Sequence, residues 1–89
     1  MKAKEMFEEL GYERKYDYIP YVNCEDIEYK KDNHIIRFCM TELGNDLQII
    51  SKDYQVDLGI KELKAINKQV EELEWNNEKE NNKKSKWVI

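Results

Sequence analysis

The stretch IEYKKDNHIIRFCMTELGNDLQIIS, residues 27–51, decides the fold. It holds three runs of strand length, at residues 27–31, 35–40 and 47–51, in which β-branched and aromatic side chains are frequent. Asp32-Asn33 suits a two-residue hairpin turn because both residues tolerate positive φ, and Gly44-Asn45 marks a second turn. Short turns join antiparallel neighbours, so the stretch predicts a meander.

The meander is expected to extend on both sides. Residues 54–58 alternate apolar and polar side chains and predict a fourth strand after a turn at 51–53. Residues 16–22 carry alternate tyrosines but also Pro20, which cannot donate a ladder hydrogen bond, so this segment is an edge strand or a loop. We therefore expect a sheet of four strands, or of five if the segment 16–22 joins it.

A long amphipathic helix follows the meander. Its apolar stripe recurs at helical spacing through Ile60, Leu63, Ile66, Val70 and Leu73. Gly59 is an acceptable N-cap, and the Glu62 side chain could close back on it. Packing of the stripe on one face of the sheet is expected to hold this helix in place.

A short helix over residues 2–10 precedes the meander. Gly11 directly follows its last apolar residue, and Tyr12 follows the glycine. This order predicts a left-handed C-terminal cap in which Tyr12 packs on Phe7. The helix is too short to be stable alone, so it is expected to dock on the rest of the domain.

These elements predict an α+β fold with a single small domain over residues 1–75. Alternation predicts the side chains that meet the last helix: Ile27, Tyr29, Phe38, Leu47, Ile49 and Val56. Both faces of the run 35–40 are apolar, so its inward set stays open. Residues 76–89 are expected to be a polar tail, either flexible or frayed helix, and they end in Trp-Val-Ile.

Composition excludes several classes of protein. The 89 residues include 15 Lys+Arg and 19 Asp+Glu, a net charge of -4, and no apolar run long enough to span a membrane. No secretory signal is seen, so a cytoplasmic location is expected. The basic run Lys83, Lys84 and Lys86 is expected to be a solvated tail, which makes nucleic acid an unlikely partner.

Two stretches carry a resemblance. The opening MKAKEMFEELGYE (1–13) and the run KELKAINKQVEELEW (61–75) resemble small uncharacterised proteins encoded by phages and prophages of Gram-positive bacteria. In those proteins a short helix ending in Leu-Gly-Tyr precedes a strand meander and a final helix. The resemblance implies a viral or mobile-element origin, with a bacterial host cytoplasm as the location, and no known activity. The family tends to place Gly before the Trp, whereas Glu74 precedes Trp75 here, so the helix could continue past Trp75.

The residues that could carry metal or nucleophilic chemistry are few. His34, the only histidine, lies beside the predicted first turn, and Cys24 and Cys39 are the only cysteines. Their spacings of 10 and 5, without a fourth Cys or His, do not fit a structural zinc site. We expect an exposed turn histidine, two reduced thiols, and Cys39 as a small hydrophobic residue of the core.

The acidic residues Glu25, Asp26 and Glu28 could in principle do acid–base work or hold Mg²⁺. A solvated strand end explains them more simply. The chain contains no phosphate-binding glycine loop and no HExxH sequence. We therefore predict a protein that is not an enzyme, with no catalytic residues, no cofactor and no metal.

The aromatic residues point to a partner instead. The predicted contact residues are Tyr12, Tyr16, Tyr18, Tyr21, Trp87, Val88 and Ile89. Tyrosine is enriched at protein interfaces, although alternate tyrosines could simply cover a small sheet. Stacking on single-stranded nucleic acid would need a basic groove, which the sequence lacks. The terminal Trp-Val-Ile could fold back on the domain or dock on a partner or a second copy.

Two functional hypotheses follow. The first is a non-enzymatic protein-binding module of phage or prophage type, which could inhibit or modify a host defence complex. The alternative is a small homodimeric protein with a nucleic-acid-associated or regulatory role, supported only by the lysine run and the exposed aromatics.

Overall fold

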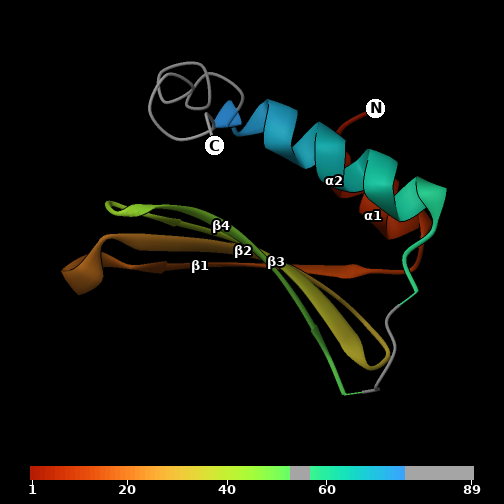
Figure 1. The fold of residues 1–89 in the computed structure, drawn as a ribbon, viewed down its shortest axis with the longest axis horizontal. Helices are drawn as coiled ribbons and strands as arrows, with labels where there is room; N and C mark the ends of the chain where they lie inside the picture. Colours follow the sequence, from red (N-terminus) through yellow and green to blue (C-terminus); the bar gives the residue numbers. More distant parts are fainter. Residues whose placement is uncertain (53–56, 76–89) are drawn as a thin grey trace, which may run out of the picture.

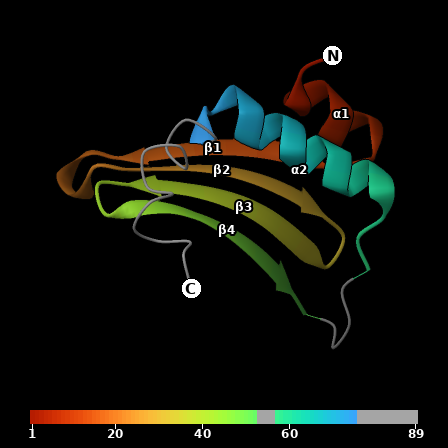
Figure 2. The same ribbon diagram turned by 45° about the horizontal axis from the view of Figure 1, so that its top comes forward.

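A computed structural model of the 89-residue chain describes residues 1–52 and 57–75. Its elements in chain order are α1 (Ala3–Glu9), β1 (Glu13–Ile19), the 3-10 turn η1 (Pro20–Val22), β2 (Cys24–Lys31), β3 (His34–Thr41), β4 (Gly44–Ser51) and α2 (Ile60–Glu72). The strands form one antiparallel sheet in the order β1-β2-β3-β4, and both helices lie over the same face (Figures 1 and 2). The predicted α+β class, with a helix, four antiparallel strands and a second helix, is confirmed.

The first strand begins earlier in the chain than the predicted segment 16–22. β1 pairs with β2 from Glu13 onwards and ends at Ile19, because Pro20 cannot continue the ladder and begins η1 instead. The segment 16–22 is therefore half strand and half 3-10 turn. The strand predicted at 54–58 lies mostly outside the described residues, and Asp57 and Leu58 are not in a strand.

The two hairpin turns differ in how well they were predicted. Asp32 and Asn33 join β2 to β3, and Asp32 adopts φ +52, as the sequence predicts. The second turn was misplaced, because it lies at Glu42-Leu43 and Gly44 already opens β4. The Thr41 hydroxyl closes this turn: it accepts from the Leu43 N–H and donates to the Gly44 carbonyl, each at 3.1 Å.

The C-terminal cap of α1 confirms its prediction. Gly11 has φ +94 and donates from its N–H to the Glu8 carbonyl at 3.0 Å, and the Tyr12 N–H reaches the Phe7 carbonyl at 3.0 Å. These two bonds form a Schellman cap, in which the residue after the glycine packs back on the helix. The Tyr12 ring meets Phe7 edge-on, with 5.5 Å between centroids.

The core lies between α1, α2 and the sheet. Phe7 stacks on Tyr29 at 3.8 Å between centroids, and the strand register sets Tyr29 opposite Ile36. The buried apolar residues are Ala3, Phe7, Tyr12, Ile27, Tyr29, Ile36, Phe38, Ala65 and Ile66. Ile36 and Phe38 therefore settle which set of the run 35–40 faces inward. Cys39 alternates with them and lies on the opposite face, so its predicted place in the core is wrong.

Helix α2 is rotated relative to its predicted stripe. Its buried side chains are Ala65, Ile66 and Gln69, whereas Ile60 is 67% exposed and Leu63 is 46% exposed. The prediction that the whole stripe is buried is therefore wrong for its first two members. At the helix start, Oε1 of Glu62 accepts from the Gly59 N–H at 3.1 Å, as predicted.

The end of α2 also departs from the prediction. The helix ends at Glu72, and Glu74 adopts φ +61, which halts the helical path before Trp75. The Trp75 ring packs against Phe38 with 5.9 Å between centroids. The predicted tail, residues 76–89, lies outside the described residues.

Candidate functional site

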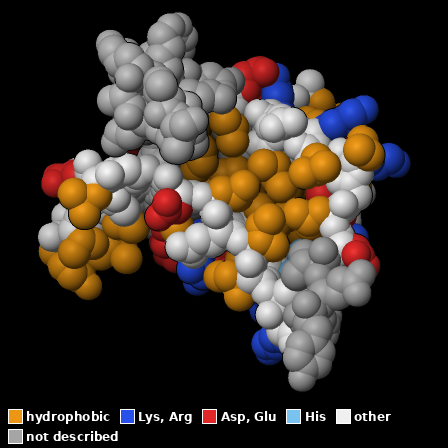
Figure 3. Space-filling view, viewed as in Figure 1, with side chains coloured by type: hydrophobic (Ala, Val, Ile, Leu, Met, Phe, Trp, Pro, Cys, Tyr) orange, Lys and Arg blue, Asp and Glu red, His pale blue; other side chains and the backbone are white. Residues whose placement is uncertain are grey.

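Exposed aromatic and apolar side chains gather at one end of the sheet. The β1–β2 and β3–β4 connections meet there, at the left of Figure 1. We define the aromatic end as Tyr16, Tyr18, Tyr21, Val22 and Leu43, all exposed. Tyr16 and Tyr18 are 49% and 48% exposed, and Tyr21 is 88% exposed. Figure 3 shows hydrophobic side chains clustered over this end of the molecule.

Strand register explains why two of these tyrosines share a face. Tyr16 lies opposite Ile27 and Tyr18 opposite Glu25, so both point to the side of the sheet that carries the helices. Helix α1 stands over the other end of β1, which leaves Tyr16 and Tyr18 uncovered by it (Figure 1). Tyr16 and Tyr18 thus lie on the inner face of an edge strand, in a part of the strand that α1 does not cover.

Hydrogen bonds fix the orientation of these rings. The Tyr16 hydroxyl donates to Oε1 of Glu25 at 3.2 Å, and the Tyr18 hydroxyl donates to Oδ1 of Asn23 at 3.2 Å. Asn23 adopts φ +49 and donates from Nδ2 to Oε1 of Glu42 at 3.1 Å. Asn23 therefore ties the β1–β2 connection to the β3–β4 turn. A surface braced in this way loses little conformational entropy when it binds.

Acidic side chains dominate the charge of this end, and one of them, Asp17, pairs with Lys15 at 3.6 Å on the outer face. Residues 16–26 and 40–46 include five carboxylates, from Asp17, Glu25, Asp26, Glu42 and Asp46, and no Lys, Arg or His. Partial desolvation and the hydrogen bond to Glu25 raise the pKa of the Tyr16 hydroxyl, which stays neutral at physiological pH. The surface thus combines neutral aromatic rings with negative side chains.

Tyr12 does not belong to this surface. Only 3% of it is exposed, because it packs on Phe7 in the core. Its predicted role as a contact residue is corrected by that burial. Trp87, Val88 and Ile89, the other predicted contact residues, lie outside the described residues.

His34 is half-buried rather than an exposed turn residue, so that prediction is wrong. Its Nε2 lies 2.7 Å from the Tyr12 hydroxyl, and the same hydroxyl lies 3.5 Å from Oε2 of Glu62. Burial, with Glu62 nearby, raises the pKa of Tyr12 to about 12. A phenol that holds its proton so firmly is a poor base or nucleophile near neutral pH. The cluster serves to join α1, β3 and α2.

The two cysteines are free thiols on the outer face of the sheet. Sγ of Cys24 lies 3.7 Å from Oδ1 of Asp26. Burial and the Asp26 carboxylate raise the pKa of Cys24, and raise that of Cys39 to about 11. Thiols with raised pKa values are weak nucleophiles because the thiolate is the reactive form.

The three acidic residues Glu25, Asp26 and Glu28 do not lie around one common site. Glu25 is on the inner face and accepts from Tyr16, while Asp26 and Glu28 are on the outer face. Glu28 accepts from Nη2 of Arg37 at 3.0 Å. Separate partners on opposite faces do not form the paired carboxylates of an acid–base site.

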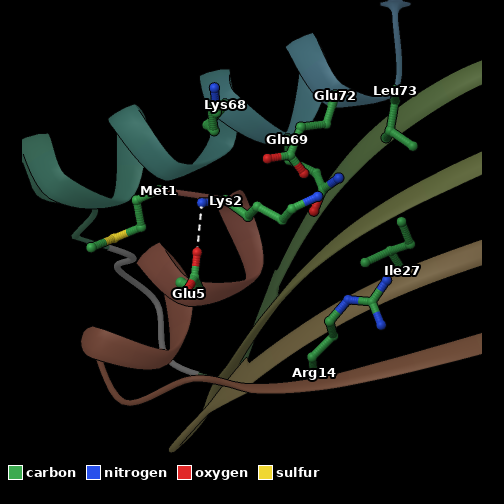
Figure 4. A pocket seen from close by; sticks show the side chains of 9 residues that line it. All are labelled: Met1, Lys2, Glu5, Arg14, Ile27, Lys68, Gln69, Glu72 and Leu73. Atoms are coloured by element: carbon green, nitrogen blue, oxygen red, sulfur yellow. Dashed lines mark hydrogen bonds between the residues drawn. The ribbon is translucent and has the colours of Figure 1, made fainter.

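An open pocket of about 770 Å³ lies between the helices and β1–β2. Figure 4 shows Lys2, Arg14 and Lys68 around it together with Glu5 and Glu72. Both carboxylates act at the start of α1: Glu5 accepts from the Lys2 N–H and Glu72 from the Ala3 N–H, each at 2.8 Å. These two carboxylates are therefore explained by their role as caps of the helix.

Comparisons add no family. Searches against protein-family models, curated protein sequences and solved structures find no match to this chain. Among the described residues there is no group of three or more acidic, His or Cys side chains that could hold a metal ion. In the same part of the chain, no helix has the length and apolar character needed to cross a membrane.

Two residues of the aromatic end were not among the predicted contact residues. Val22 lies in η1, and Leu43, fully exposed, occupies the β3–β4 turn. A large apolar residue at a turn position is a usable signal, since turns normally carry polar residues or glycine. The predicted turn at Gly44-Asn45 lies just beyond Leu43, so the sequence did not identify Leu43 as a turn residue.

Proposed function

We propose that this protein is a non-enzymatic protein-binding module whose contact surface is the aromatic end. The observation that carries the proposal is the bracing of exposed tyrosines by Glu25 and Asn23. Exposed aromatic rings form the energetic centre of many interfaces, and rings held in place bind at a lower entropic cost.

The chemistry of this surface favours a basic partner. Lys and Arg side chains pair with carboxylates, and Arg in particular stacks on tyrosine rings. Glu25 and Glu42 are the carboxylates tied to these tyrosines, since Glu25 accepts from Tyr16 and Glu42 accepts from Asn23, the partner of Tyr18. We infer that the partner presents Arg or Lys next to apolar side chains. Phosphate backbones would be repelled by the same carboxylates, so we favour protein over nucleic acid.

A phage or prophage origin would make that partner a host protein, and competition for a basic groove would make the module an inhibitor. Nucleic-acid-binding proteins and their regulators commonly carry such grooves. This part of the proposal rests on the resemblance of residues 1–13 and 61–75 and on the acidity of the aromatic end.

Affinity capture from a bacterial lysate with mass spectrometry tests the proposal. The bait is compared with a Tyr16→Ala, Tyr18→Ala double variant and with Glu13→Ala, Lys15→Ala, a control on the opposite face of the same strand. We expect a protein that wild type and control retain and the tyrosine variant loses. Identical protein sets on all three baits would overturn the proposed surface.

A further inference from the structure

The two edges of the sheet are built differently. β1 carries four charged residues among seven, Glu13, Arg14, Lys15 and Asp17, whereas β4 carries only Asp46 among eight and contains no Lys, Arg or Pro. Charged and proline-containing edges discourage pairing with another chain. Among the described residues, no strand pairs with the outer side of β4. Its edge lacks the features that would keep a further strand away.

An apolar band borders this edge. Leu47 and Ile49 are opposite the core residues Phe38 and Ile36, so they share the inner face, yet each is 42% exposed. Figure 3 shows hydrophobic side chains extending across the middle of this view. An exposed apolar band of this kind marks an interaction surface.

Helix α2 contributes its own exposed flank to the band. Lys61 and Lys64 face α1, where they line a hollow with Met6 and Leu10. Helical spacing places Leu63 away from that contact and Ile60 opposite the buried side of α2, and β4 is the strand on the open side of α2 (Figure 2). The apolar stripe of α2 is thus wider than the face that the single chain buries.

We propose that β4 pairs with β4 of a second copy of this chain, to form a symmetric homodimer with one continuous sheet. The strand is self-complementary: an antiparallel pair centred on Gln48 sets Leu47 of each copy opposite Ile49 of the other. It also sets Asp46 opposite Ile50, so the single charges do not meet. A two-fold axis perpendicular to the sheet keeps all helices on one face, with the Leu63 flank of each α2 turned toward the axis.

The proposal does not depend on the tyrosines of the aromatic end, since β1, which carries Tyr16 and Tyr18, and β4 are opposite edges of the sheet. Each dimer then has two aromatic ends. Two such surfaces would let one dimer engage a repeated or dimeric partner with higher avidity than a single chain.

Sedimentation equilibrium of the full chain, from about 1 to 100 µM, tests the pairing. Wild type is expected at twice the 10.8 kDa chain mass, and Ile49→Lys at the mass of one chain. Tyr18→Lys, at the opposite edge, should remain dimeric. Circular dichroism shows that each variant is folded. A monomeric wild type, or a dimer unaffected by Ile49→Lys, would overturn the proposal.

Disulfide crosslinking is a second test, and it does not require a charged residue to be introduced into the interface. Residues facing each other across the axis have Cα atoms about 4.5 to 5.5 Å apart, which suits a disulfide. In a Cys24→Ser, Cys39→Ser background, Gln48→Cys should form a covalent dimer under mild oxidation, and Asp17→Cys should not. Equal crosslinking of the two variants, or none for Gln48→Cys, would contradict the register.

Discussion

The hydroxyl of Tyr29 donates a 2.6 Å hydrogen bond to Oε1 of Gln69, and both side chains are buried. This bond joins β2 to α2 across 40 residues of sequence, directly beside the stacked pair Phe7 and Tyr29. It gives a buried amide a partner, and buried polar groups are stable only when they have one. The contact therefore fixes the rotation of α2 that leaves Leu63 exposed.

We expect Tyr29→Phe to destabilise the fold. The phenyl ring can still stack on Phe7, but Oε1 of Gln69 loses its buried donor, at a cost of about 1–3 kcal/mol. Urea unfolding at one fixed protein concentration measures the change. Tyr18→Phe, an exposed tyrosine, should stay within roughly 0.5 kcal/mol of wild type. A Tyr29→Phe variant as stable as wild type would show that the bond contributes nothing.

Ile66 and Lys64 are two residues apart on α2, and substitution by aspartate should destabilise the fold strongly at Ile66 and hardly at all at Lys64. Ile66 is 6% exposed, so Ile66→Asp buries an unpaired carboxylate at a cost of several kcal/mol, on the order of the total stability of a small domain. Lys64 is exposed, and Lys64→Asp should change stability by about 0.5 kcal/mol or less. Thermal unfolding compares them, and equal melting temperatures would refute the assigned orientation of α2.

The pKa of Tyr12, raised to about 12 from 10.0, predicts a stability that depends on alkaline pH. The folded chain favours the neutral phenol, so this contribution is complete below pH 10 and is lost as the pH rises through about 12. Tyr12→Phe has no proton to lose. The stability difference between wild type and Tyr12→Phe should therefore fall across this window, by on the order of 2 kcal/mol. A constant difference would contradict the assignment.

Cys39 should react slowly in the folded protein. With its pKa at about 11 instead of 9.0, the thiolate fraction at neutral pH falls about a hundredfold. Thiol titration in a Cys24→Ser background should show slow labelling that becomes fast under denaturant. Asp26→Asn should speed the native reaction because it removes the carboxylate near the thiol, whereas Asp46→Asn, opposite Cys39 in the register, should not. Equal rates for the two variants would remove Asp26 as a cause.

Local sequence signals predicted the parts of the fold that depend on neighbouring residues. The Gly11-Tyr12 cap and the Asp32-Asn33 turn need only a few adjacent residues, and both were confirmed. Burial of Gln69 could not be predicted in that way. Its partner Tyr29 is distant in the chain, and a polar residue on a helix is ordinarily assigned to solvent.

The candidate site was predicted in part. Tyr16, Tyr18 and Tyr21 are exposed as a contact surface requires, but Tyr12 was included because spacing alone does not separate it from them. What separates it is the cap of α1, which turns its ring onto Phe7. Asn23 gave no signal, because its bond to Glu42 depends on two connections that only the folded sheet brings together.

The affinity for the captured partner tests the central claim most directly. Titration calorimetry with the purified partner compares wild type, the Tyr16→Ala, Tyr18→Ala variant and the Glu13→Ala, Lys15→Ala control, all shown to be folded by circular dichroism. If the aromatic end is the contact surface, the tyrosine variant binds at least about tenfold more weakly, a loss of roughly 1.4 kcal/mol, and the control binds as wild type does. Three equal dissociation constants would contradict the account.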